Sequence, residues 1–399
     1  MRVLPLVHTI LQHRRREGTC NLDTTAFLRW LQGMMAEKGA SHRKRIIRFQ
    51  HTQDFRRFLH EWSEMKNSVS TLQSVRQMGI IQAISCPIPD DSPHRRFDGR
   101  VWVETDQRVR IHGVTSRVPA PEKGIPWGVA HIKAPQAWST TTGHKIRIGV
   151  VDTGVDFSHP DLRGSLARGI NLLNRSLLPH DDNGHGTHIA GTIAAANQLQ
   201  GMIGVAPRSL IHPIKAFDHN GSAYVSDIIL AIDWCVRNRM NIINMSFGMK
   251  SRSKALLSAV TNAANAGVII VASSGNDGKR RAIDYPARYP QTISVGATTR
   301  LRRIAPFSNR GIYIDIYAPG DKITSAWLKG KYHEMSGTSM ATSHVSGAVA
   351  LLLAKHPDLT PAEVKASLRR SMQPLRGKKA PRMTGELDVA KMLQMMEKQ

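Results

Sequence analysis

The chain has 399 residues with a formal net charge of +25, and 41% of its residues are hydrophobic. This length favours two unequal domains, and the hydrophobic content suffices for a substantial core. No apolar run approaches the ~20 residues that a membrane span requires, and three cysteines form no even disulfide framework. Composition thus argues against a membrane-spanning protein and against a disulfide-rich secreted domain.

The N-terminus lacks the order of features found in a secretory signal. Its short apolar run is broken by His8 and is followed by a basic run at residues 14–16, whereas a signal carries its charge first. Together with the cysteine count, this predicts a thiol-containing protein of the cytoplasm. Release from the cell by an unconventional route is the alternative.

Residues 1–40 are interpreted as an N-terminal extension. Its one amphipathic stretch, Thr24 to Met35, carries its apolar side chains on one face, and this spacing is typical of a helix. We interpret it as a packing helix, with a recruitment segment as the alternative.

Residues 41–112 predict a small α/β domain. Residues 43–50 and 78–88 are strand-like, residues 52–65 form an amphipathic helix, and a further strand follows at residues 101–103. The next segment, residues 113–124, is rich in Pro and Gly and has no apolar periodicity. It predicts an exposed linker with a proteolysis site.

The remaining residues, 125–399, alternate short apolar strands with helices. This alternation predicts an α/β domain with a parallel sheet covered on both faces. The predicted strands are Ile146–Val151, Leu210–Ala216, Ile242–Ser246, Val268–Ala272 and Thr292–Val295, and helices are predicted at Val225–Arg237 and Lys254–Ala266. Cys235, inside the first of these helices, is expected in the core.

Three junctions in this region each carry one polar residue. Asp152 ends a buried strand, His185 heads a small-residue helix, and Ser339 lies in the turn before an apolar helix. A helix N-terminus favours negative charge near the serine oxygen. A serine in such a turn is by itself an ordinary helix cap. However, the order Asp, His, Ser is one of those known for hydrolase triads.

At these residues the chain resembles the subtilisin-like serine proteases. The resemblance rests on VVDTGVD around Asp152, HGTHIAGT around His185, ASSGND around Asn276 and SGTSMA around Ser339. It implies a doubly wound, mostly parallel α/β fold and a serine endopeptidase. By this resemblance, Ser339 is the nucleophile, His185 the general base and then acid, and Asp152 the residue that orients the imidazole. Asn276 would donate to the oxyanion.

The resemblance also implies a zymogen and a substrate groove. The domain at residues 41–112 has the element order of the family's inhibitory propeptide, so the chain's own propeptide is an expected intramolecular partner. Two backbone edges are expected to hold an extended protein or peptide substrate by strand addition. The residues expected to bind substrate are Ser246, Phe247 and Gly248 on one edge, Ser222 and Ala223 on the other, and Gly275, Asp277 and Asp284 around the pocket for the side chain before the cleaved bond.

Asp284 predicts the specificity of that pocket. A carboxylate at the base of a desolvated pocket favours a cation, so Arg or Lys is expected before the cleaved bond. The maturation site would then follow one of the arginines before the catalytic domain, Arg108, Arg110 or Arg117. The alternative is that Asp284 pairs internally with a nearby arginine (Arg280, Arg281 or Arg288) and leaves the pocket neutral.

A structural calcium is the one cofactor that the resemblance suggests, and none is required for the chemistry. Asp161 and the loop at residues 196–202 fall where the family often binds this ion, which takes six to eight oxygen ligands. Gln198 replaces the usual asparagine, and Lys123 falls near another ligand position. Asp161 is therefore a candidate ligand only.

Two other classes of function compete with the enzyme. Ser343 stands where the family has proline, and the serine restores a backbone N–H to the first helical turn. We expect an altered but working turn. A catalytically silent protease-fold scaffold is the alternative. The high positive charge favours nonspecific binding to polyanions. No nucleic-acid-binding motif is present, so no specific nucleic acid is expected as a partner. We expect a monomer.

Overall fold

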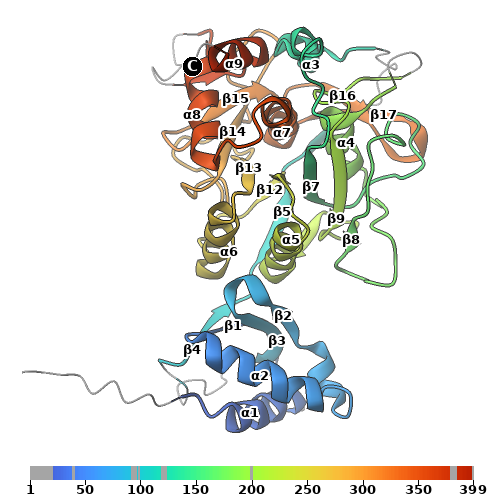
Figure 1. Cartoon of the computed structure of the whole chain (residues 1–399). Helices are drawn as coiled ribbons and strands as arrows, with labels where there is room; N and C mark the ends of the chain where they lie inside the picture. The colour runs from blue at the N-terminus through green and yellow to red at the C-terminus, as the bar shows by residue number, and fades with distance from the viewer. Residues whose placement is uncertain are drawn as a thin grey trace, which may run out of the picture.

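The computed structural model describes residues 21–37, 41–90, 97, 99–117, 124–197, 201–377 and 384–397, with residues 114–117 as backbone only. The elements fall into a smaller N-terminal unit and a larger one, and strand β5 runs from the first into the second (Figure 1). Across these ranges no helix is both long and apolar enough to cross a membrane.

The smaller unit is an antiparallel sheet covered by two helices. Its sheet has the order β2-β3-β1-β4 in the described residues. The elements are α1 (Thr24–Ala36), β1 (His42–Phe49), α2 (Thr52–Met65), η1 (Ser70–Ser74), β2 (Arg76–Met78), η2 (Gly79–Ile81), β3 (Ala83–Pro89) and β4 (Val101–Thr105). Helix α2 has the predicted bounds because its apolar side chains recur at helical spacing and pack on the sheet.

Two predictions for this unit need correction. Helix α1, assigned to a separate extension of residues 1–40, packs through Phe27, Leu28 and Leu31 into the core of the smaller unit, so residue 40 is not a structural boundary. The strand predicted at residues 78–88 is interrupted by η2, because Gln82 adopts a left-handed conformation with φ of 55°. Residues 1–20 lie outside the described residues.

The larger unit is built on a mostly parallel sheet. In the described residues its order is β18-β19-β15-β14-β13-β11-β7-β9-β8, with only β18 and β19 antiparallel. Its strands are β7 (Arg147–Asp152), β8 (Ile170–Asn171), β9 (Leu210–Lys215), β11 (Ile242–Met245), β13 (Ile269–Ser273), β14 (Ile293–Thr298), β15 (Ile316–Pro319), β18 (Gln373–Pro374) and β19 (Gly385–Glu386). The predicted doubly wound α/β fold is confirmed.

Helices cover both faces of this sheet, and each face has its own apolar cluster. On one face lie α4 (His185–Ala194), α7 (Thr338–Lys355), α8 (Pro361–Ser371) and α9 (Val389–Met396), and on the other α5 (Val225–Arg237) and α6 (Lys254–Asn265). Shorter elements are α3 (Trp127–His131), η4 (Ala134–Ala137) and η5 (Leu328–Gly330). Cys235 is buried in the cluster beneath α5 and α6, as predicted.

Two small sheets join the units. Strand β5 (Arg108–Ile111) lies between β10 (Ser222–Tyr224) and β12 (Phe247–Gly248), and pairs antiparallel with both. Strand β6 (Val114–Arg117) pairs with β17 (Tyr332–Ser336), which also pairs with β16 (Ile323–Ala326). The segment predicted as an exposed linker therefore begins as a paired strand. Residues 118–123 of that segment lie outside the described residues.

Candidate active site

Asp152 and His185 form a buried pair at the edge of the large sheet. Asp152 is the last residue of β7, and His185 is the first residue of α4. Nδ1 of His185 lies 2.8 Å from Oδ1 and 2.9 Å from Oδ2 of Asp152, and both residues are fully buried. The backbone N–H of Thr153 also donates to Oδ1 of Asp152, at 2.8 Å. The carboxylate thus fixes the orientation of the imidazole.

A second carboxylate, Asp181, ties the two elements together. It accepts hydrogen bonds from the hydroxyl group of Thr153 at 2.8 Å, from the N–H of Gly184 at 2.9 Å and from the hydroxyl group of Thr187 at 2.6 Å. A carboxylate at the N-terminus of α4 satisfies donors that the helix leaves unpaired. Asp181 therefore holds the end of β7 against the start of α4.

Ser339 lies in the first turn of α7, fully buried. Its hydroxyl group donates to the carbonyl oxygen of Ser246 at 2.8 Å. Nε2 of His185 is buried and has no hydrogen-bond partner among the described residues. A Cβ atom built on Gly113 would lie 3.4 Å from this Nε2, so the free nitrogen of the imidazole lies beside the backbone of Gly113.

Asn276 has its amide group fixed by the residue that precedes Ser339. Oδ1 of Asn276 accepts from the N–H of Thr338 at 2.9 Å and from its hydroxyl group at 2.8 Å. This leaves Nδ2 as the group that can face a ligand. A Cβ atom built on Gly337 would lie 3.1 Å from Nδ2 of Asn276 and 2.6 Å from the carbonyl oxygen of His112. The amide and that carbonyl therefore border the same small space.

Both predicted substrate-binding edges are paired with a segment of this same chain. Ser222 and Ala223 lie opposite Arg110 and Val109 of β5 on one side. On the other side Phe247 and Gly248 lie opposite Ile111 and Arg110, and the carbonyl oxygen of Ser246 accepts from the N–H of His112 at 3.1 Å. Residues 108–112 thus lie in the groove as an extended strand, and Val109 is buried in the α5-side cluster.

The side chain of His112 enters the pocket that contains Asp284. Nε2 of His112 lies 2.9 Å from Oδ2 of Asp284, and Nδ1 lies 2.8 Å from the hydroxyl oxygen of Ser273. Gly248 and Gly275 border Asp284: a Cβ atom on either would lie 2.8 Å from an atom of its side chain. Asp284 is 2% exposed.

Asp284 has an internal basic partner, and it is a lysine rather than one of the arginines considered. Nζ of Lys250 lies 2.8 Å from Oδ1 of Asp284 and also pairs with Asp277 at the rim. Burial acts to lower the pKa of Lys250, but its hydrogen bonds to Asp277 and Asp284 outweigh this and raise it. The hydrogen bond from Lys250 lowers the pKa of Asp277. The carboxylate of Asp284 is therefore already partly neutralised.

Asp161, the predicted calcium ligand, is surrounded by hydrogen-bond donors. Oδ1 accepts from the amide of Asn197 at 2.8 Å, while Oδ2 accepts from Tyr332 at 2.7 Å and from the N–H of Met202 at 3.0 Å. Burial and the bond to Asp161 raise the pKa of Tyr332. Within the described residues no group of three or more His, Cys, Asp or Glu could hold a metal ion. Both carboxylate oxygens of Asp161 thus accept hydrogen bonds from this chain; Lys123 and Gln198 lie outside the described residues.

Sequence reasoning missed three residues of this site. His112 was placed at the end of the small domain, Ser273 was given no role within the ASSGND motif, and Lys250 was not considered. His112 and Lys250 are brought to Asp284 by pairings between segments far apart in the chain, and no local pattern records those pairings. Ser273 directly follows the predicted strand at Val268–Ala272, and its place within the ASSGND motif around Asn276 is the one signal that could have identified it.

Ser343, the departure from the family pattern, is accommodated without an unpaired polar group. It is buried in α7, and its hydroxyl group donates to the carbonyl oxygen of Met340 at 2.7 Å. A hydroxyl bonded to the preceding turn is compatible with a helix. The helix that carries Ser339 is therefore intact at this position.

Comparison with known proteins identifies the family. The sequence profile of the subtilase family matches residues 143–386. The chain is 42% identical over 251 residues to subtilisin from Bacillus pumilus, a match that covers 62% of this chain and 90% of that protein. The identity is also 42% to subtilisin E from Bacillus subtilis (strain 168), of which 65% is covered, and 41% to a thermostable alkaline protease from Halalkalibacterium halodurans, of which 68% is covered. The chain belongs to the subtilase family of serine endopeptidases.

Proposed function

We propose that the chain hydrolyses peptide bonds through Asp152, His185 and Ser339, with Asn276 as an oxyanion donor. The observation that carries this proposal is the buried pair of Asp152 and His185, whose remaining nitrogen faces the segment in the substrate groove. These residue types and positions supply a nucleophile, a base, an orienting acid and an electrostatic stabiliser.

The chemistry follows the order of an acyl transfer. The hydroxyl group of Ser339 turns from Ser246 to Nε2 of His185, which accepts its proton as Oγ attacks the carbonyl carbon. Negative charge on the carbonyl oxygen is stabilised by Nδ2 of Asn276. His185 then gives the proton to the leaving amine, the C–N bond breaks, and water releases the acyl group from Ser339 by the same two proton transfers. Asp152 stabilises the imidazolium throughout.

The smaller unit is proposed to act as an intramolecular inhibitor. Its strand β5 fills the groove, and two of its carboxylates bind the ends of catalytic-unit helices. Glu104 accepts hydrogen bonds from the N–H groups of Lys254 and Ala255 at the start of α6, at 3.1 and 3.2 Å. Asp106 accepts from the N–H of Ser226 at the start of α5, at 2.9 Å. Carboxylates at helix N-termini are favourable, so these contacts support a tight complex.

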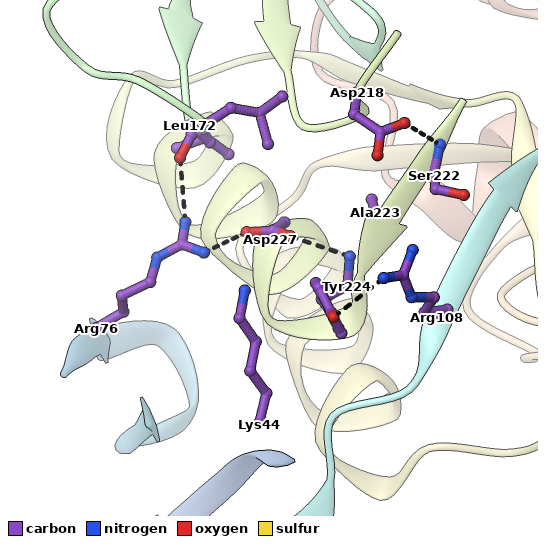
Figure 2. Close-up of a pocket in the computed structure, with 10 residues that line it drawn as sticks. Lys44, Arg76, Arg108, Leu172, Asp218, Ser222, Ala223, Tyr224 and Asp227 are labelled. Atoms are coloured by element: carbon purple, nitrogen blue, oxygen red, sulfur yellow. Dashed lines mark hydrogen bonds and ion pairs between the residues drawn. The ribbon is translucent and has the colours of Figure 1, made fainter. Parts of the chain in front are cut away.

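Basic side chains of the smaller unit add a polar contact beside the groove. Figure 2 shows Arg76 between Asp227 and the carbonyl oxygen of Leu172, and Arg108 against the hydroxyl group of Tyr224. The ammonium group of Lys44 lies over the ring of Tyr224, 4.0 Å from its centre. These ion-pair, hydrogen-bond and cation–π contacts favour binding of a positively charged propeptide to this surface.

Self-processing is proposed at the bond between His112 and Gly113. The carbonyl group of His112 borders Asn276, and Gly113 borders Nε2 of His185, and both contacts support cleavage of this bond. Arg108 and Arg110 lie upstream of it in β5, and Arg117 lies downstream in β6. The proposed mature chain therefore begins at Gly113, and we propose that it acts on extended proteins or peptides as a monomer.

A fluorophosphonate probe tests the proposal on the purified full-length chain. We expect the probe to label Ser339, and N-terminal sequencing of the processed chain to begin at Gly113. The precursor with Ser339→Ala should remain uncleaved and unlabelled. A wild-type chain that is folded but neither labelled nor active on any peptide would instead support a silent scaffold. Processing of the Ser339→Ala chain at the wild-type rate would contradict the role of Ser339.

A further inference from the structure

We propose that this protease selects histidine before the scissile bond, and that Asp284 and Ser273 form its histidine-binding site. The inference rests on the proposed function, because it treats residues 108–112 as a substrate bound in the groove. It names the substrate class as extended peptides that carry an imidazole at this position. Histidine then takes the place that the sequence assigned to Arg or Lys.

The pocket uses both nitrogens of the imidazole ring. Asp284 binds Nε2 at 2.9 Å and Ser273 binds Nδ1 at 2.8 Å, from opposite ends of the ring. The side chain of His112 is 11% exposed and that of Asp284 is 3% exposed. Hydrogen bonds in such a desolvated place discriminate strongly, because a guest that cannot make them leaves buried polar groups unpaired.

The two partners suit histidine in either protonation state. The carboxylate of Asp284 only accepts, so Nε2 carries a hydrogen in the complex. The hydroxyl group of Ser273 can donate to a neutral Nδ1 or accept from a protonated one. A neutral imidazole and an imidazolium are therefore both fully hydrogen-bonded, and no other side chain offers two ring nitrogens at this spacing.

The walls of the pocket leave room for a flat ring. A Cβ atom on Gly248 would lie 2.3 Å from Cε1 of His112, so any side chain at this position would collide with the imidazole. Gly275 has a φ of 102°, and a Cβ atom there would lie 2.8 Å from Oδ2 of Asp284. Both glycines keep Asp284 within reach of the ring.

Lys250 argues against arginine or lysine as the preferred guest. Its ammonium group already holds Oδ1 of Asp284 at 2.8 Å and Oδ2 at 3.1 Å, and it also pairs with Asp277. A guest with a fixed positive charge would lie close to this ammonium group and be repelled. Phenylalanine or leucine would fit the slot but would leave Asp284 and Ser273 without the donor and acceptor that histidine supplies.

The test uses peptides with the chain's own sequence from residue 107 to 116, in which His112 is kept or replaced by Phe, Leu, Arg or Gln. The self-processed wild-type enzyme is titrated with the fluorophosphonate probe, and kcat/KM is measured for each peptide by mass spectrometry. We expect the His peptide to exceed the Phe and Arg peptides at least tenfold. Asp284→Asn should reduce the ratio of His to Phe at least tenfold, and Ser273→Ala should reduce it severalfold.

Asp358→Asn is the matched control, since it removes an exposed carboxylate beyond the far end of α7, about 27 Å along the helix from its start. It should leave every ratio unchanged. A labelled, active enzyme that prefers Phe, Leu or Arg over His would overturn the inference and leave the proposed function intact. An unlabelled chain that cleaves no peptide would overturn both. If Asp284→Asn does not mature, Ser273→Ala alone decides, and an unchanged ratio of His to Phe counts against the site.

Discussion

The backbone N–H of His112 and the hydroxyl group of Ser339 donate to the same acceptor, the carbonyl oxygen of Ser246, at 3.1 and 2.8 Å. The residue before the proposed scissile bond and the proposed nucleophile are thus both hydrogen-bonded to one carbonyl oxygen. The shared acceptor also directs the hydroxyl proton away from the base, His185.

Replacement of Asn276 tests the stabilisation of the oxyanion. Asn276→Leu keeps the size of the side chain and removes Nδ2, so kcat should fall by a factor on the order of 10² to 10³, the cost found for this donor in subtilisin itself, with KM little changed. Steady-state kinetics of the processed enzyme measure both constants. A loss in kcat below fivefold would mean that Asn276 does not face the developing charge.

Glu104 should contribute to inhibition by the smaller unit. Glu104→Gln weakens two charge-assisted hydrogen bonds to the start of α6, so the complex should lose about 1–2 kcal/mol and the lag between cleavage and full activity should shorten severalfold. The lag is followed by comparing the cleaved fraction on a gel with peptide hydrolysis. The control is Glu64→Gln, because Glu64 is exposed within the smaller unit. Equal lags in the two variants would exclude the capping role.

Removal of Lys250 should shift the specificity of the pocket. Lys250→Met keeps the aliphatic stem but leaves Asp277 and Asp284 without their ammonium partner, so kcat/KM for a peptide with Arg before the scissile bond should rise about tenfold. Lys279→Met, in an exposed position of the neighbouring loop, is the control for a general change in charge. If both variants raised the Arg peptide equally, the direct pairing would not be the cause.

His344 should make the fold sensitive to acid. Burial lowers the pKa of His344 from 6.5 to about 4, and its ring is fully buried in α7. The unfolded chain therefore binds this proton more readily between pH 6.5 and pH 4. Stability from this group is complete above pH 6.5 and is lost as the pH falls towards 4, by at most about 3 kcal/mol.

Chemical unfolding at pH 7.5 and pH 4.5 checks this, in the Ser339→Ala background so that no self-digestion occurs. His344→Gln should reduce the loss of stability between the two pH values, whereas His60→Gln, at an exposed position, should not. An equal loss in all three chains would show that other groups cause the acid sensitivity.

Much of the fold could be predicted because its signals are local. Helices α2 and α5 have their predicted bounds. The helical spacing of their apolar residues and the signals at their ends all lie within about a dozen neighbouring residues. The interruption of the strand at residues 78–88 could not be predicted. It depends on a left-handed Gln82, a conformation that the residue type does not favour.

The candidate site also contains residues with a local sequence signal and residues without one. Asp152, His185, Asn276 and Ser339 each lie in a recognisable motif. The structure pairs Asp152 with His185 and holds Asn276 against Thr338, the residue before Ser339. The contents of the pocket depend on pairings across more than 100 residues, such as that between β5 and β12. Asp284 was identified from its neighbours along the chain, but Lys250, which pairs with it, is positioned by tertiary packing.

The pairing of β6 with β17 means that the two pieces of the cleaved chain would behave differently. Cleavage after His112 would free the upstream half to diffuse away, whereas residues 113–117 would remain covalently part of the enzyme. This segment would compete with substrates for the leaving-group side of the cleft. Because it stays attached, its effective concentration would be on the order of millimolar and would not fall on dilution. Turnover of other proteins would then require two steps. Strand β5 must dissociate into solution, and β6 must separate from β17 while it remains covalently attached to the enzyme.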